Sequence, residues 1–176
     1  KAALKAAQKE AKAQMAEAVK MDQALVAKIN EKAASVEEIL SECKKGQALV
    51  RKAIKSGGVA ENKLGEAYKT LADFAQFPNN VMLNLSQNNQ PFDTTFFYSN
   101  LKTLTSALQG EIKNTKITMG ETGNENYIKG KKAALAQSAN FFLYAAQLFS
   151  NGEHHDKALD AFETALNYKK LYPEVA

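Results

Sequence analysis

Two neighbouring stretches near the C-terminus decide the fold: N-F-F-L-Y-A-A-Q-L-F at 140–149 and K-A-L-D-A-F-E-T-A-L at 157–166. In both, apolar residues and alanines recur at spacings of three and four, which is the period of one face of an α-helix. Gly152 lies between the stretches, where a glycine ends a helix, and Pro173 lies just beyond the second. We therefore predict an antiparallel helix pair over residues 139–172.

Upstream of this pair, the same period continues through most of the 176 residues. Residues 1–33 contain neither glycine nor proline and carry an apolar stripe from Leu4 to Ile29, so they predict an N-terminal amphipathic helix. Comparable stripes predict the other helices. The six predicted helices cover about 1–33, 36–54, 61–76, 94–110, 131–150 and 155–168.

Residues with strong local preferences mark the ends of these helices. Ser35 and Glu38 have the spacing of a capping box, in which the serine hydroxyl accepts a hydrogen bond from the amide of the third helical residue. Asp93 or Thr94 is expected to cap the fourth helix in a similar way. The Ser56-Gly57-Gly58 stretch is expected to end the second helix, with a glycine past the last turn in the left-handed conformation.

Segments rich in glycine, proline or asparagine are expected to interrupt the helices. The Pro78-Asn79-Asn80 triplet is expected to end the third helix. Residues 79–92 are polar around a short apolar patch at 81–85, which forms either a buried loop or a helical turn. Gly110 either ends the fourth helix or lies within it. Residues 117–130, which hold three glycines, are predicted to form a loop.

Composition agrees with an all-α fold and limits the classes of function. Hydrophobic residues make up 45% of the chain and charged residues 24%, so we do not predict a disordered, fibrous or membrane-embedded protein. No apolar run approaches the ~20 residues that a transmembrane segment needs. The net charge is +4, but Arg51 is the only arginine. A basic excess made almost entirely of lysine argues against nucleic-acid binding, which favours arginine.

The stretch from Ala139 to Leu171 resembles a tetratricopeptide repeat. The residues that carry the resemblance are Phe142, Ala145, Ala146 and Phe149 on the first helix and Ala158, Phe162 and Ala165 on the second. Small residues such as Ala146 and Ala158 let two helices approach, and Phe162 fills the space beside them. The resemblance implies a TPR-like α-solenoid of antiparallel helix pairs, a single helical-repeat domain over 1–176, although no clean repeat period connects the pair with the upstream helices.

The resemblance also implies a scaffold that binds a protein or peptide, with neither catalytic activity nor a cofactor. The positions that would face its groove are Asn140, Leu143, Gln147 and Asn151. Some members of the family hold a peptide carboxylate between a lysine and an asparagine. No lysine is among these four positions, so that clamp is not predicted. A peptide or polar ligand held by other contacts stays open, and its identity is not predicted.

The remaining reactive side chains do not form a catalytic or metal-binding set. Cys43 lies on an apolar stripe with no histidine nearby in the sequence, so we expect a buried thiol rather than a nucleophile. The His154-His155-Asp156 cluster resembles a metal site in composition only. Its neighbouring side chains point in different directions, and no second cluster supplies further ligands. We expect these residues to form the turn between the last two helices.

An alternative function is a structural helical protein that self-associates through its N-terminal helix or through an uncapped C-terminal face. Stacked repeats end in a capping helix, and none follows Lys170 in this sequence. We therefore expect the last face to pack elsewhere, to mediate association, or to continue in a longer natural protein. The first residue, Lys1, fits a removed signal peptide or simple trimming. The compartment stays open, with an exported or periplasmic location favoured.

Overall fold

The computed structural model describes residues 1–31, 35–115 and 125–172. Within these residues the chain forms α-helices, one short 3₁₀ helix and no strand, so the predicted all-α fold is confirmed. The elements are α1 (Ala2–Glu31), α2 (Val36–Lys55), η1 (Glu61–Lys63), α3 (Leu64–Ala75), α4 (Phe77–Gln87), α5 (Thr94–Asn114), α6 (Glu125–Asn151) and α7 (His155–Leu171).

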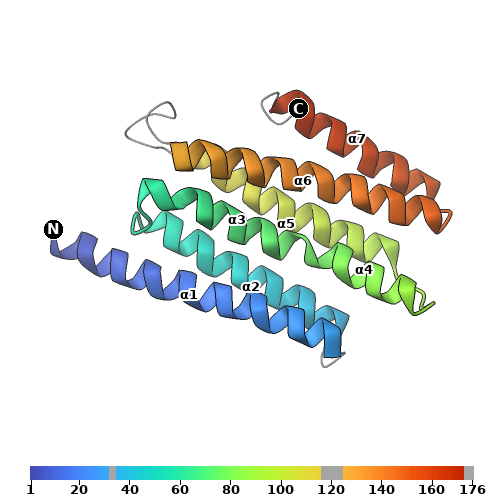
Figure 1. Ribbon diagram of the computed structural model, residues 1–176, viewed down its shortest axis with the longest axis horizontal. Helices are drawn as coiled ribbons and strands as arrows, with labels where there is room; N and C mark the ends of the chain where they lie inside the picture. The colour runs from blue at the N-terminus through green and yellow to red at the C-terminus, as the bar shows by residue number, and fades with distance from the viewer. Residues whose placement is uncertain (32–34, 116–124, 173–176) are drawn as a thin grey trace.

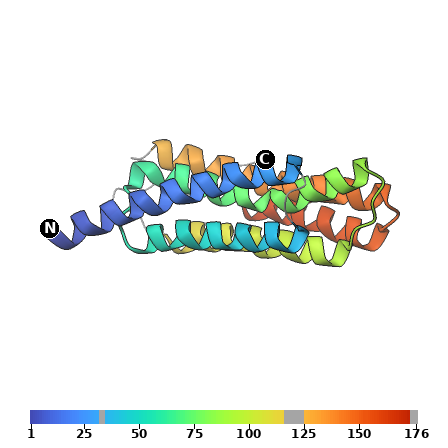
Figure 2. The same cartoon turned by 90° about the horizontal axis from the view of Figure 1, so that it is seen from below.

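The helices lie side by side with their axes roughly aligned, and α1 and α7 form the two outer edges (Figure 1). Figure 2 shows α2 and α5 in one layer and α3, α4 and α6 in the other. The core fills the space between the layers. Its largest fully buried side chains include Tyr68, Phe74, Phe77, Phe142, Phe149, Leu101, Leu104 and Leu108. Burial of these apolar surfaces supplies most of the driving force for packing the helices together.

One buried polar side chain joins three of the helices. Gln47 of α2 is 3% exposed, and its Nε2 donates hydrogen bonds to the backbone oxygens of Leu71 in α3 and Leu104 in α5, both at 2.9 Å. A carbonyl oxygen has two lone pairs, so each acceptor can also serve its own helix. Gln47 therefore fixes how α2 is rotated against α3 and α5 without leaving a donor of its own Nε2 unused.

The prediction that Pro78-Asn79-Asn80 ends a helix is wrong. Helix α3 ends at Ala75, and α4 begins at Phe77 after the single residue Gln76, whose φ of −79° and ψ of −19° are themselves helical. Proline is tolerated in the first turn of a helix because the amide it lacks has no acceptor there. The apolar patch left open as loop or turn lies on α4, which accounts for the seventh α-helix of the described residues.

The prediction of a loop over 117–130 is also wrong at its end, because α6 begins at Glu125. Residues 117–124 of that loop lie outside the described residues. Gly130 lies inside α6 and packs on Gly65 of α3: a Cβ added to Gly130 would lie 2.2 Å from the Cα of Gly65. Gly130 therefore lets two helix backbones cross in contact, which any side chain would prevent.

Three of the local signals at helix ends behave as predicted, namely the Ser35 cap, the left-handed glycine after α2 and the cap of α5. The amide of Glu38 donates a hydrogen bond to Ser35 Oγ at 3.2 Å, and Gly57 has a φ of +76°. Asp93 rather than Thr94 caps α5, because Asp93 Oδ1 accepts a hydrogen bond from the amide of Phe96 at 3.2 Å. Helix α5 then continues through Gly110 to Asn114.

The last two helices, α6 and α7, lie next to each other (Figure 1). Of the residues predicted to pack between them, Phe142, Ala145, Ala146, Phe149 and Ala165 are buried and Ala158 is half-buried. The prediction for Phe162 is wrong, since this side chain is 47% exposed. Ala161 and Tyr168 occupy the buried side of α7 instead, and Tyr168 stacks on Phe142 with ring centroids 5.8 Å apart.

Candidate binding surfaces

The exposed side of α7 carries a row of large apolar side chains, which we call the α7 outer face. Leu159, Phe162 and Leu166 are 60%, 47% and 41% exposed. Their spacings of three and four place them on one side of the helix. Single apolar residues are normal on a protein surface, but a contiguous row is typical of an interaction site.

The opposite side of α7 is anchored to α5 and α6. The hydroxyl of Tyr98 in α5 donates a hydrogen bond to the Asp160 carboxylate and lies 3.4 Å from Thr164 Oγ1. Burial, followed by the hydrogen bond with Asp160, raises the pKa of Tyr98, so its hydroxyl keeps its proton at neutral pH. These contacts fix the rotation of α7, and they leave the α7 outer face directed away from the core.

The four predicted groove positions all lie on α6. Asn140, Gln147 and Asn151 are exposed, whereas Leu143 is half-buried and packs against the core. The structure therefore keeps the three polar side chains on the accessible side of one helix. None of the four lines the hollows described below.

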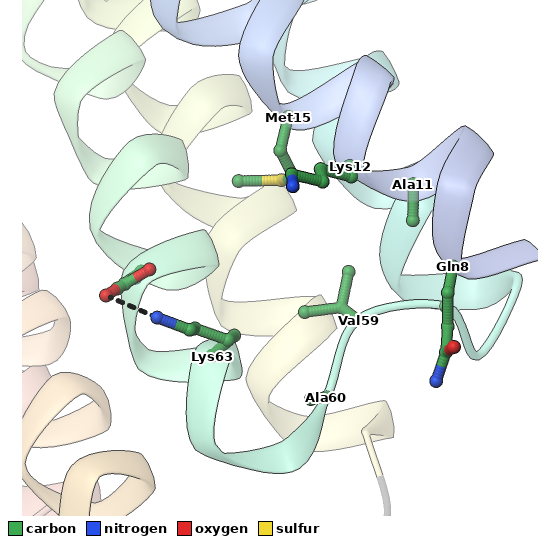
Figure 3. A pocket seen from close by; sticks show the side chains of 9 residues that line it. Gln8, Ala11, Lys12, Met15, Val59, Ala60 and Lys63 are labelled. Atoms are coloured by element: carbon green, nitrogen blue, oxygen red, sulfur yellow. Dashed lines mark ion pairs between the residues drawn. The ribbon is translucent and has the colours of Figure 1, made fainter.

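A hollow of about 390 Å³ lies where the first half of α1 passes over the connection between α2 and α3. We call it the apolar hollow, because Ala11, Met15, Val59 and Ala60 form much of its wall. In Figure 3 Val59 extends from the connection toward Met15 of α1. Met15 and Val59 are half-buried and pack against the core, so the packing of the fold holds these two wall residues in place.

A second hollow, of about 350 Å³, lies between the start of α3 and the first half of α6, beside the Gly65–Gly130 crossing. We call it the lysine hollow, because Lys63, Lys69 and Lys129 line it together with a single acid, Glu66. Lys63 and Glu66 also line the apolar hollow, so the two hollows adjoin at this pair.

The reactive side chains considered from the sequence lie in two places, at Cys43 in α2 and at the start of α7. Cys43 is buried, as predicted, and burial raises the pKa of its thiol, which keeps it protonated. His154 precedes α7 and His155 begins it, and both are exposed. Across the described ranges, no three His, Cys, Asp or Glu side chains gather as a metal would require. No described helix has the length and apolar character of a membrane span.

The carboxyl group of Asp22 in α1 lies where its charged form is disfavoured. Its Oδ1 is buried and has no hydrogen-bond partner among the described residues. Burial, and then the like charge of Asp73, raise the pKa of Asp22, and Lys69 only partly offsets this. The folded state therefore binds the Asp22 proton more tightly than the unfolded state does. Because of this group, the free energy of unfolding falls as pH rises above about 4, through the range between the unfolded-state and folded-state pKa values of Asp22.

We expect Asp22→Asn to be more stable than the wild type at pH 7, because the buried charge is removed. The difference is expected to shrink as pH falls and to disappear near pH 3, where the wild-type carboxyl is protonated in both states (about one unit below the ordinary pKa). Urea unfolding at the two pH values measures both effects. Glu17→Gln, an exposed change on the same helix, serves as the control and is expected to have little effect at either pH.

Neither the α7 outer face nor the adjoining hollows were predicted from the sequence. For α7 a signal was present: apolar residues occupy positions 158, 159, 161, 162, 165, 166 and 168, which is too wide an arc for one buried face. The hollows depend on contacts between segments far apart in the chain and leave no local signal.

Comparisons of the chain with protein-family models, curated proteins and solved structures find no match, so the function must be argued from its own residues.

Proposed function

We propose that the chain is a TPR-like helical scaffold that binds a protein partner through the α7 outer face and has no catalytic activity. The observation that carries the proposal is the row of Leu159, Phe162 and Leu166, left exposed on an edge helix whose opposite side is firmly anchored. Burying such a row against a partner removes apolar surface from water, at roughly 25 cal/mol per Å² before the costs of association.

The spacing of the row indicates the kind of partner. Side chains at three- and four-residue intervals complement a second amphipathic helix, whose own apolar residues have the same period. An aromatic residue at the centre, here Phe162, is the usual anchor of such contacts. Neighbouring helix pairs of a repeat array pack on one another in this way, which supports the TPR-like assignment. The burial of Cys43 and the scattered acids support a binding role rather than catalysis.

We expect Phe162→Glu to weaken partner binding by about thirtyfold or more, as for a central anchor residue. Because Phe162 is already half-exposed, the free energy of unfolding is expected to change by less than about 0.5 kcal/mol. The binding measurement uses a partner purified with the wild-type chain and then titrated against both proteins by calorimetry.

The matched control is Tyr144→Glu, which replaces a 37% exposed aromatic residue on α6 by the same acid. Its binding is expected to equal that of the wild type, since Tyr144 is outside the α7 outer face. A Phe162→Glu chain that remains folded and binds with wild-type affinity contradicts the proposal.

A second candidate function, self-association through the same face, is favoured by the charges along α7. The first half of α7 carries three acids, Asp156, Asp160 and Glu163, against the single base Lys157, and its last turn carries Lys169 and Lys170. Two copies of α7 packed antiparallel about Phe162 would place the acidic end of each helix against the basic end of the other. A two-fold contact of this kind uses one self-complementary surface. Light scattering separates the candidates: a constant mass near 19.2 kDa at high concentration excludes self-association.

A further inference from the structure

Helix α1 and the connection beneath it are in close contact beside the apolar hollow. A Cβ added to Gly58 would lie 2.2 Å from the backbone oxygen of Ala7, so the two backbones touch at one end of the hollow. Beyond this contact the side chains of Met15 and Val59 leave a space of about 390 Å³, which falls within the ~300–1,000 Å³ typical of small-ligand sites. Figure 3 shows Lys12 above this space and Lys63 at its edge.

The charges around the two hollows are mostly positive. Lys12 lines the apolar hollow, Lys129 lines the lysine hollow, and Lys63 lines both, against the single acid Glu66. Lys69 also lines the lysine hollow, but its Nζ is paired with Asp73 at 3.0 Å. Lys12 and Lys129 form no ion pair with a described residue. Lys63 pairs with Glu66 at 3.6 Å, but both side chains are exposed, so the pair is weak and an anion can replace it.

The lysine hollow also contains an unsatisfied polar atom. Gln137, one of its lining residues, has a buried Oε1 with no hydrogen-bond partner among the described residues. Buried polar atoms in native proteins are normally paired, so an orphan at the wall of a hollow calls for a partner. The hydroxyl of a singly protonated phosphate head group can donate the missing hydrogen bond, whereas an ionised carboxylate cannot.

We propose that the adjoining hollows bind a single-chain anionic amphiphile. Its aliphatic chain lies in the apolar hollow against Met15 and Val59, and its carboxylate or phosphate head lies in the lysine hollow near Lys63 and Lys129. This site is on the side of the molecule formed by α1, α3 and the start of α6, away from the α7 outer face (Figure 1). It is therefore independent of the partner-binding role.

Decyl phosphate is the probe for the first test, with the methionine methyl groups of the full chain labelled with ¹³C for NMR. We expect the Met15 methyl signal to shift in a saturable way, whereas that of Met82, which is fully buried in the core, stays in place. From hexyl to decyl phosphate, affinity is expected to rise about fourfold for each added methylene, the value of one buried CH₂. Inorganic phosphate is expected to leave Met15 unchanged. Decanoate, compared with decyl phosphate, shows which head group the site prefers.

Two variants and an uncharged probe test the head-group site. The double variant Lys63→Gln, Lys129→Gln is expected to bind decyl phosphate about tenfold more weakly and to keep the chain-length dependence. Lys52→Gln, an exposed change on α2, is the matched control and is expected to bind like the wild type. Decyl maltoside, which has no charge, is expected to bind at least about tenfold more weakly than decyl phosphate. An unmoved Met15 signal with decyl phosphate, or equal binding of decyl maltoside, overturns the proposal.

Discussion

Gly130→Ala is expected to destabilise the fold by about 3 kcal/mol, at the upper end of the range for overpacked cores. The added methyl group would lie 2.2 Å from the Cα and 2.8 Å from the carbonyl carbon of Gly65. These are backbone atoms of α3, which cannot rotate aside as the end of a flexible side chain can. Helices α3 and α6 must therefore separate, and the core beside Tyr68 and Tyr127, whose rings are 5.9 Å apart, must loosen with them.

The matched control is Gly110→Ala, because Gly110 lies within α5 and has nothing within 4 Å of the added Cβ. This substitution is expected to stabilise the protein by about 0.5–1 kcal/mol, since alanine is a better helix former than glycine. Urea denaturation followed by far-ultraviolet circular dichroism measures both variants. Equal effects of the two substitutions would show that the helices do not cross in contact at Gly65 and Gly130.

Arg51→Met is expected to lower the free energy of unfolding by about 3 kcal/mol. Arg51 Nε donates to Glu111 Oε1 at 2.8 Å, joining α2 to α5. The Glu111 side chain is only 5% exposed, whereas that of Arg51 is 38% exposed. Methionine keeps much of the apolar stem of arginine, so the principal loss is the positive charge. The Glu111 carboxylate would then be buried without its counter-charge, which is the costly way to break such a pair.

The second substitution Glu111→Gln is expected to recover most of the stability lost in Arg51→Met, because it removes the unpaired charge while retaining the shape of the side chain. Lys45→Met is the control at an exposed pair: Lys45 Nζ and Glu42 Oε1 are 3.3 Å apart, but the lysine is 67% exposed. Its effect is expected to be below about 1 kcal/mol. If Glu111→Gln gives no recovery in the Arg51→Met background, burial of the charge is not the cause.

Features that depend on a few adjacent residues could be predicted from the sequence. The Ser35 cap, the left-handed Gly57 and the burial of Cys43 follow from local hydrogen bonding, backbone sterics and apolar period. The same local rules were misleading at Gly130. Glycine weakens an isolated helix, so a loop was predicted, but the contact with Gly65 makes glycine the residue that fits there.

Phe162 illustrates the limit for the candidate site. The apolar period of α7 permits two choices of buried side, and the large apolar surface of an aromatic residue favours the side that carries Phe162. The structure buries the small Ala161 and Ala165 against neighbouring helices, with Tyr168 stacked on Phe142. Which side faces inward is decided by contacts with α5 and α6, such as that of Tyr98, and these are not encoded in α7 alone.

The two hollows could not be predicted from the sequence for a related reason. Their walls combine α1, the connection after α2, and the first turns of α3 and α6. Lys12 and Lys129, for example, are separated by most of the chain, and the sequence around each predicts only an exposed lysine. Only the packing of the helices brings their side chains to adjoining spaces.

The most direct test of the central claim replaces Phe162 by benzoylphenylalanine, a photoreactive aromatic residue, and irradiates the protein in its native cells. The α7 outer face predicts one cross-linked product of discrete mass, which disappears when Leu166→Glu is added. A mass of twice the chain would identify a second copy as the partner. The same probe at Tyr144, on the exposed side of α6, is predicted to give no product. A product from position 144 and none from position 162 would contradict the account.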